Sequence, residues 1–173
     1  MEMSRSSRRE GMLLRSARGG SADAFEQLFR EHWPNAYRAA LLVVHDQAAA
    51  EDIAQEAFLR AIRALDRFDR RRPFAPWLHR IVVNRAIDWA RARASRQESD
   101  LDGDRPSPEQ RPDVGDELMA ALARLSPEHR AVVVLRHLLG YTPGEIAEQL
   151  DLPRGTVNSR LRRGLDDLRG HLE

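Results

Sequence analysis

The chain of 173 residues contains no cysteine, which excludes disulfide bonds, zinc–thiolate centres and thiol redox sensing by the chain itself. It also contains no lysine, so every basic side chain other than histidine is an arginine. No apolar run approaches the roughly 20 residues that a membrane-spanning helix needs. Residues 1–9 are rich in serine and arginine and lack the apolar centre of a secretory signal. We therefore expect a cytoplasmic protein without membrane insertion.

The sequence also lacks the patterns that support catalysis or cofactor binding. No serine lies in a nucleophile-elbow pattern, and no glycine-rich loop is suited to holding a phosphate. The six histidines are scattered without the spacing of metal ligands: His32, His45, His79, His129, His137 and His171. We expect no catalytic residue, no metal, no cofactor and no small-molecule substrate, and hence a protein that is not an enzyme.

Charge is present in blocks, although the net charge is only +1. Acidic residues outnumber basic ones over residues 23–66, and the balance is strongly basic over 67–96. Residues 97–117 are acidic again, and the last predicted helix is basic. Such blocks indicate separate surfaces for separate partners.

Residues 142–163 read as two short helices joined by a tight turn. Thr142 and Glu145 form a capping-box pattern, and Pro143 occupies the first helical position. Asp151 lies in the turn, where a left-handed backbone is expected, and aspartate tolerates that conformation better than most residues. Beyond the turn an apolar stripe recurs at helical spacing: Val157, Leu161, Leu165, Leu168 and Leu172.

The polar face around this stripe has the residue types that contact phosphates and base edges. They are Arg154, Thr156, Asn158, Ser159, Arg160, Arg162 and Arg163. We interpret the segment as a helix-turn-helix whose second helix enters a major groove. The alternative is a helical hairpin whose arginine-rich face is simply exposed and does not touch DNA.

A second amphipathic helix is predicted from a cap at Asp46 to about Leu65. Its polar side carries Asp52, Gln55 and Glu56, opposite an apolar face. That side is either a solvated surface or a docking face for a basic partner, and for this helix taken alone the solvated surface is favoured.

A third helix should begin near Ala75 or Pro76. Trp77, Arg80, Asn84, Asp88 and Arg91 follow one another at spacings of three or four residues and so share one face. An aromatic ring interleaved with guanidinium groups and an amide is typical of single-strand nucleic-acid binders. Periodicity is equally consistent with Trp77 packing in the core beside solvated arginines.

These patterns predict an all-α fold of two small helical domains joined by a flexible acidic linker, the C-terminal one a helix-turn-helix. Residues 1–20 form an N-terminal tail, disordered over its first ten residues or in part a short helix. The first domain covers 21–95, where Ser21 caps a helix that Pro34 should kink or interrupt. The linker covers 96–115 and the second domain 116–173. The linker composition leaves the relative placement of the domains open.

Taken together, these segments resemble a bacterial RNA polymerase sigma factor of the extracytoplasmic-function (ECF) group in the sigma-70 family. The resemblance covers about residues 20–170. Residues 50–58 look like the core-polymerase-binding segment of that family, and residues 74–84 look like the segment that melts and reads the −10 element. Residues 125–130 and 145–161 look like its −35-reading domain.

Carried over by position, the resemblance implies three functional sets. The core-polymerase-binding set is Asp52, Gln55 and Glu56. The −10 set is Trp77, Arg80, Asn84 and Arg85, with Arg91 on the same face. The −35 set is Arg136, Arg154, Thr156, Asn158, Ser159, Arg160 and Arg163. Asn158 stands where members often carry a basic residue, so no −35 sequence preference is transferred.

The resemblance also implies the activity and the partners. The chain would bind core RNA polymerase, direct it to promoter DNA at the −35 and −10 elements, and help to melt the −10 region. Members are usually held inactive by an anti-sigma factor, and this is an expectation from the family alone. Two other hypotheses remain open: a stand-alone helix-turn-helix regulator of operator DNA, and a protein–protein adaptor whose arginine faces bind acidic partners.

Overall fold

The computed structural model describes residues 2–69, 72–99 and 114–172, and every regular element in these ranges is a helix. The expected all-α class is therefore confirmed for the described part of the chain. The elements are α1 (Glu2–Arg18), α2 (Ala22–Val44), α3 (Gln47–Arg63), the short 3₁₀ helix η1 (Leu65–Arg67), α4 (Phe74–Ser99), α5 (Val114–Arg124), α6 (Pro127–His137), α7 (Pro143–Leu150) and α8 (Arg154–Leu172).

Helix starts follow the local capping signals of the sequence. The side chains of Ser21, Asp46 and Ser126 accept hydrogen bonds from the backbone N–H groups three residues further on, at 3.2, 2.9 and 3.3 Å. Each side chain thereby satisfies a backbone donor that has no partner inside its helix. Pro34 lies inside α2 and does not divide it, so the local break considered for this position is absent.

Helix α1 covers the residues for which disorder was the expectation over 1–10. Its inward side explains the difference, because the Glu10 carboxylate accepts a hydrogen bond from the backbone of Phe74 and lies 3.3 Å from Nε2 of His32. The hydrogen bond with His32 lowers the pKa of Glu10, and its partial burial raises that pKa by less. Leu14 is buried one turn later. Contacts with residues distant in sequence thus hold the helix.

The expected linker over 96–115 is shorter at both ends. Helix α4 continues to Ser99, and α5 already begins at Val114, so only the middle of the expected linker is left, and it lies outside the described residues. The end of α4 is held by tertiary contacts. Arg93 lies over the ring of Trp89 and forms a 3.0 Å ion pair with Asp46.

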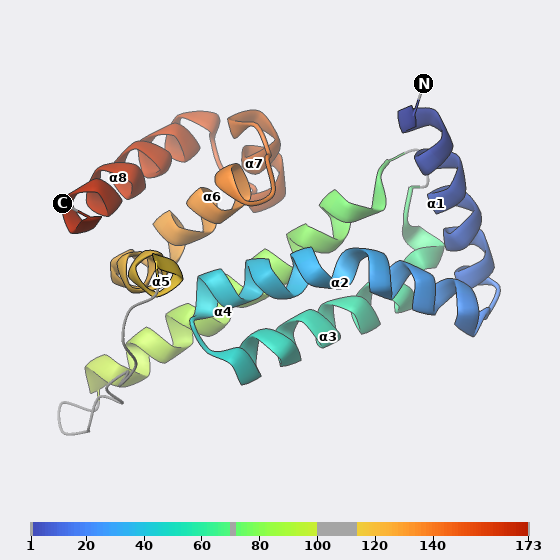
Figure 1. The fold of residues 1–173 in the computed structure, drawn as a ribbon, viewed down its shortest axis with the longest axis horizontal. Coiled ribbons are helices and arrows are strands. Elements are labelled where there is room, and N and C mark those ends of the chain that lie inside the picture. The colour runs from blue at the N-terminus through green and yellow to red at the C-terminus, as the bar shows by residue number, and fades with distance from the viewer. Residues whose placement is uncertain (1, 70–71, 100–113, 173) are drawn as a thin grey trace.

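The two halves of the chain pack against each other. Helices α2, α3 and α4 lie side by side, and α5 to α8 lie against α2 and α4 (Figure 1). One buried apolar cluster includes Val43 and Leu78 from the first half together with Leu135, Ile146 and Val157 from the second. The placement that the sequence left open is therefore an extensive contact between the halves.

The helix-turn-helix has the local geometry that its sequence predicts. Thr142 and Glu145 complete the capping box, since each side chain accepts a hydrogen bond from the backbone N–H of the other residue. Asp151 adopts the left-handed conformation with φ 53°. At Gly164 of α8, a Cβ atom would lie only 3.0 Å from the Val133 side chain of α6, so glycine permits this close helix–helix approach. The second helix of the motif is thereby fixed against α6.

Candidate nucleic-acid and partner interfaces

The polar face of α8 is open to solvent along its first turns. Arg154, Asn158 and Arg163 are exposed, and Thr156, Ser159 and Arg160 are partly exposed beside them. The stripe on the opposite side is buried at Val157, Leu161 and Leu168. The helix thus presents the predicted −35 residues on one side while its apolar side holds it to the domain.

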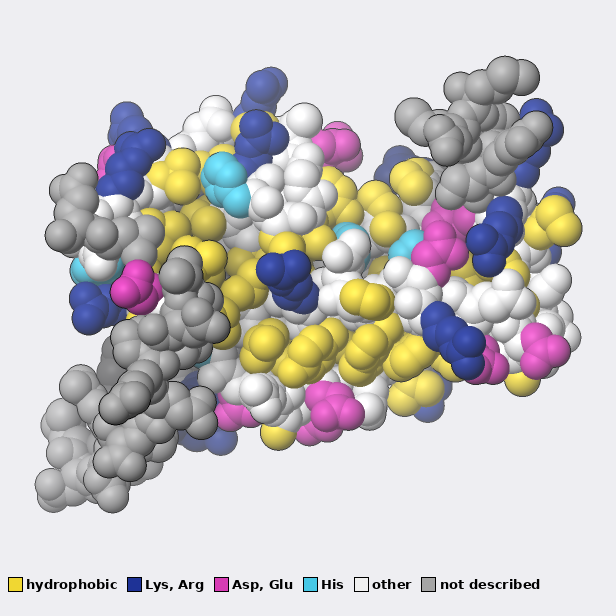
Figure 2. Space-filling view, viewed as in Figure 1, with side chains coloured by type: hydrophobic (Ala, Val, Ile, Leu, Met, Phe, Trp, Pro, Cys, Tyr) yellow, Lys and Arg dark blue, Asp and Glu magenta, His cyan; other side chains and the backbone are white. Residues whose placement is uncertain are grey.

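Arg136 lies near this surface, at the end of α6. It is exposed, and its guanidinium donates a 3.1 Å hydrogen bond to the backbone carbonyl of Tyr141. This bond orients the side chain towards the loop that enters the motif. In the space-filling view, basic side chains stand out along the upper edge of the molecule, over the C-terminal helices (Figure 2).

Four of the five predicted −10 residues line one small cavity on α4. Trp77, Arg80, Asn84 and Arg85 surround a volume of about 290 Å³. Arg60 of α3 completes the wall and was missed by the sequence reasoning, because it belongs to a different helix. An aromatic ring, an amide and three guanidinium groups around one hollow suit a base and its phosphates.

Trp77 shows why periodicity left two interpretations open. Its ring packs at 4.7 Å against Phe68 and at 5.8 Å against Phe74, yet it stays partly exposed beside the α4 cavity. One side of the ring therefore serves the core and the other faces the hollow. The two interpretations describe two sides of the same ring.

Arg91, the fifth predicted residue, does not join this cavity. Its guanidinium forms an ion pair of 2.5 Å with Glu128 at the start of α6. Burial raises the pKa of Glu128, and the hydrogen bond from Arg91 more than offsets this, so the pKa lies below its usual value. Glu128 is therefore a charged partner of Arg91 at neutral pH.

The predicted docking residues of α3 are all exposed on one side of the helix. Asp52, Gln55 and Glu56 face solvent, while Ile53 and the neighbouring apolar residues are buried. The carboxylate of Glu56 accepts a 3.1 Å hydrogen bond from Arg85 on α4. The acidic side of α3 thus borders the basic side of α4 directly.

Leu59 is a further residue on this side of α3. It is 52% exposed, which is unusual for a leucine in a helix whose apolar residues are otherwise largely buried. It follows Glu56 by three residues and Gln55 by four, so all three share one face. The signal was available in the sequence as an apolar residue at a polar position of the helical pattern.

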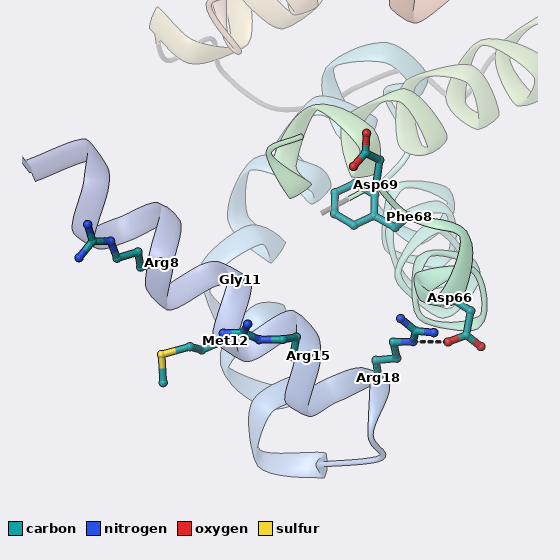
Figure 3. Close-up of a pocket in the computed structure, with 8 residues that line it drawn as sticks. All are labelled: Arg8, Gly11, Met12, Arg15, Arg18, Asp66, Phe68 and Asp69. Atoms are coloured by element: carbon teal, nitrogen blue, oxygen red, sulfur yellow. Dashed lines mark hydrogen bonds and ion pairs between the residues drawn. The ribbon is translucent and has the colours of Figure 1, made fainter. Parts of the chain in front are cut away.

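A large open hollow lies between α1 and the segment that follows η1. Its volume is about 770 Å³, and α1 contributes three arginines to the wall, while Asp66, Phe68 and Asp69 form the other side (Figure 3). Arg18 and Asp66 form a 2.5 Å ion pair across it. This pair is exposed, so its contribution to stability is small. The hollow contains none of the residues that the sequence assigned to DNA.

Two buried imidazoles predict a loss of stability in mild acid. Burial lowers the pKa of both His45 and His79 to about 4, with smaller effects from the charges of Arg130 and His32 respectively. In the unfolded chain both titrate near pH ~6.5, so that state binds more protons between the two values. Stability is therefore full above the unfolded pKa and falls as the pH drops towards the folded one.

The measurement is urea unfolding at about pH 7 and about pH 5, followed by circular dichroism. The denaturation midpoint should be lower at the acidic pH. The variant His45→Gln/His79→Gln should lose most of that difference, because Glu10 and Asp46, whose pKa values are also lowered, titrate below this range. An unchanged difference in the variant would assign the effect to other groups.

The described residues were also compared with the requirements of metal and membrane sites. Among them, no cluster of three or more His, Asp or Glu side chains is placed to hold a metal ion. None of the described helices combines the length and the apolar character that crossing a membrane requires.

Comparison with known families accounts for both halves of the chain. The sigma-70 region 2 family matches residues 28–96, and the sigma-70 region 4 family matches residues 115–168. The first match contains α3 and most of α4, and the second contains the helix-turn-helix. The class of protein is thus a sigma factor with these two regions.

Individual relatives narrow the class. The chain is 34% identical over 165 residues to the RNA polymerase sigma factor CarQ of Myxococcus xanthus, covering 90% of this chain and 95% of CarQ. It is 34% identical over 161 residues to the ECF RNA polymerase sigma factor SigM of Mycobacterium tuberculosis, covering 92% and 82%. With the ECF sigma factor SigE of Mycolicibacterium smegmatis it shares 38% identity over 159 residues, and the alignment spans 86% of this chain and 62% of SigE, less than two thirds of that longer relative.

Solved structures agree with the fold. CnrH, in complex with the cytosolic domain of CnrY, matches with a TM-score of 0.71 and 30% identity, over 95% of this chain and 97% of CnrH. The sigma factor RpoE of Bartonella quintana, in complex with the anti-sigma factor NepR, matches with a TM-score of 0.69 over 86% of this chain and 96% of RpoE. Its 24% identity supports the fold alone.

The chain belongs to the ECF sigma factors of the sigma-70 family. Members of this family are transcription initiation factors that direct RNA polymerase to promoters. The stand-alone operator regulator is not favoured, because it accounts for the helix-turn-helix and leaves the region 2 match unexplained.

Proposed function

We propose that three faces of this chain divide the work of promoter recognition. Asp52, Gln55 and Glu56 on α3 dock on core RNA polymerase, and the hollow of α4 takes the separated −10 strand. The −35 set on α8, with Arg136, reads or clamps duplex DNA. Residues 21–95 and 116–173 act as the two functional domains, and the segment between them connects the two promoter contacts.

The observation that carries this proposal is the α4 cavity. Trp77, Arg80, Asn84 and Arg85 come from one and a half turns or more of helix and still converge on about 290 Å³ of space. Opening a duplex costs stacking free energy, and capturing unstacked bases on such a surface offsets part of that cost. The acidic face of α3 lies directly beside it, so one rigid unit would hold polymerase and melted DNA together.

The proposal includes the setting in which the chain works. It has no catalytic role of its own, and the polymerase supplies the chemistry of RNA synthesis. It acts in the cytoplasm, where the polymerase and the chromosome are. By analogy with the sigma factor RpoE, which was solved with the anti-sigma factor NepR, we also propose that a dedicated anti-sigma factor regulates this chain.

The test is transcription from a panel of promoter fragments by purified core polymerase, with and without the chain. We expect start sites that appear only when the chain is added, and their aligned upstream sequences should reveal a −35 and a −10 element. A chain that shifts duplex DNA by itself but neither binds core polymerase nor starts transcription would overturn the proposal in favour of an operator-binding regulator.

A further inference from the structure

The α4 cavity of about 290 Å³ is not the only hollow in which the −10 residues take part. Trp77 and Arg80 also line a cleft of about 570 Å³, whose near wall includes Arg67 and Arg72. The far wall comes from the C-terminal half of the chain and consists of Tyr141, Glu145, Glu148 and Gln149. The predicted −10 face is therefore opposed by the first helix of the helix-turn-helix.

Two of the predicted DNA contacts are already occupied by the C-terminal half. The amide nitrogen of Asn84 lies 3.4 Å from the backbone carbonyl oxygen of Gln149, at the end of α7. Arg91 is paired with Glu128 of α6. An amide and a guanidinium that are to read a base and hold a phosphate thus have protein partners.

Further contacts fasten the same interface. Nδ1 of His79 and the hydroxyl of Tyr141 lie 2.7 Å apart, between α4 and the loop before α7. Arg130 of α6 donates a hydrogen bond to the carbonyl of Val43 at the end of α2. A buried apolar cluster continues across the contact.

The charges on the cleft walls oppose a nucleic acid in this arrangement. Glu145 and Glu148 stand across the cleft from Arg67, Arg72 and Arg80. These carboxylates occupy the side from which a strand would approach and would repel its phosphates. The acidic face of α3 lies elsewhere, since α3 packs against α2, α4 and η1 and its three docking residues remain exposed.

From these contacts we infer that the C-terminal domain masks the −10 face of its own chain, so that the free protein accepts core polymerase on α3 but excludes the −10 strand until the two domains separate. The inference rests on the proposed function of α4. It makes polymerase binding the event that precedes DNA capture. The apparent affinity for single-stranded DNA is then reduced by the fraction of molecules that are open.

The test loosens the interface without altering the proposed DNA-binding residues. Glu128→Gln removes the partner of Arg91, and Tyr141→Phe removes the hydroxyl that meets His79. The probe is a dye-labelled single-stranded oligonucleotide of random sequence, titrated with the full-length chain in the absence of polymerase. We expect the double variant to bind it about threefold to tenfold more tightly than wild type, in keeping with the loss of one charged and one neutral hydrogen bond.

Domain separation is measured in the same proteins. Because the chain contains no cysteine, spin labels can be placed uniquely by Arg38→Cys on α2 and Gly170→Cys on α8, both exposed positions. Wild type should give one narrow distance distribution, and Glu128→Gln/Tyr141→Phe a broader one that extends to longer distances. The single variants should lie between the two and guard against a folding defect in the double variant.

Two controls define the cause of any gain. Asp166→Asn removes a carboxylate that pairs with an arginine within α8, and it should leave the affinity unchanged. Adding Asn84→Ala to the loosened variant should reverse most of the gain, because the unmasked face is the one that binds. A gain of equal size from Asp166→Asn would overturn the inference, since it would indicate a general effect of charge.

The remaining outcomes separate this inference from the proposed function. A broad distance distribution in the wild type would overturn masking, as would equal oligonucleotide affinities for wild type and the broadened variant. Either result could coexist with normal promoter-dependent transcription, and then the sigma function would stand alone. Failure to bind core polymerase would instead be a failure of the proposed function.

Discussion

Changing Asp52 and Glu56 to arginine is expected to abolish binding to core RNA polymerase while leaving the fold intact. Both side chains are exposed on α3, so their replacement removes no core contact. Reversal turns two attractive charges at a docking surface into repulsive ones, which should weaken binding by at least about 100-fold. Polymerase affinity is measured by titrating labelled core enzyme, and the fold by circular dichroism and thermal unfolding.

The single variant Asp52→Arg is the cleaner form of this experiment. Glu56 also accepts a hydrogen bond from Arg85, so its reversal places two guanidinium groups side by side near the −10 face. Asp52 has no such neighbour role among the described contacts. Glu31→Arg, at an exposed position of α2, is the matched control for a charge reversal away from α3. Unaltered binding by the double variant would show that the acidic side of α3 is only a solvated surface.

Replacing Asn84 by alanine is expected to slow promoter opening by about tenfold and to change polymerase affinity by less than about twofold. The amide lines the α4 cavity between Trp77, Arg80 and Arg85, and it is the only neutral group there that can both donate to and accept from a base edge. Loss of one such contact is worth about 1–3 kcal/mol. Opening is followed by the reactivity of unpaired thymines, and binding by titration with the core enzyme.

Asn35→Ala provides the comparison for this second prediction. Asn35 is exposed on α2, so the exchange of a helical asparagine for alanine is the same and its place in the molecule is different. It should leave both opening and binding unchanged. If Asn84→Ala reduced opening and polymerase binding equally, the assignment of the α4 cavity to the −10 strand would be wrong.

The features that the sequence predicted correctly are those with short-range causes. Ser21, Asp46 and Ser126 cap helices through bonds to residues three positions away, so their role is legible from a few letters. The capping box of Thr142 and the left-handed turn at Asp151 are local in the same sense. The convergence of Trp77, Arg80 and Asn84 follows from helical spacing alone.

The features that sequence reasoning missed depend on contacts between distant residues. Glu10 meets His32 and the backbone of Phe74, and no local pattern announces that these contacts extend α1. Arg60 and Leu59 belong to α3, where their helical positions do not reveal what α4 places beside them. Arg91 fits the helical stripe of the −10 set but is paired with Glu128, 37 positions away. The linker composition could not disclose that the domains meet.

Arg130 has a consequence for how the molecule unfolds. Its buried guanidinium donates to the carbonyls of Leu122, Ala123 and Leu125 around the start of α6, and also to that of Val43 at the end of α2. Burial lowers its pKa to about 10, so the charge persists at neutral pH. If either half of the chain melted alone, this cation would lose carbonyl partners that water must replace. The two family regions should therefore unfold in one cooperative transition rather than as two independent units.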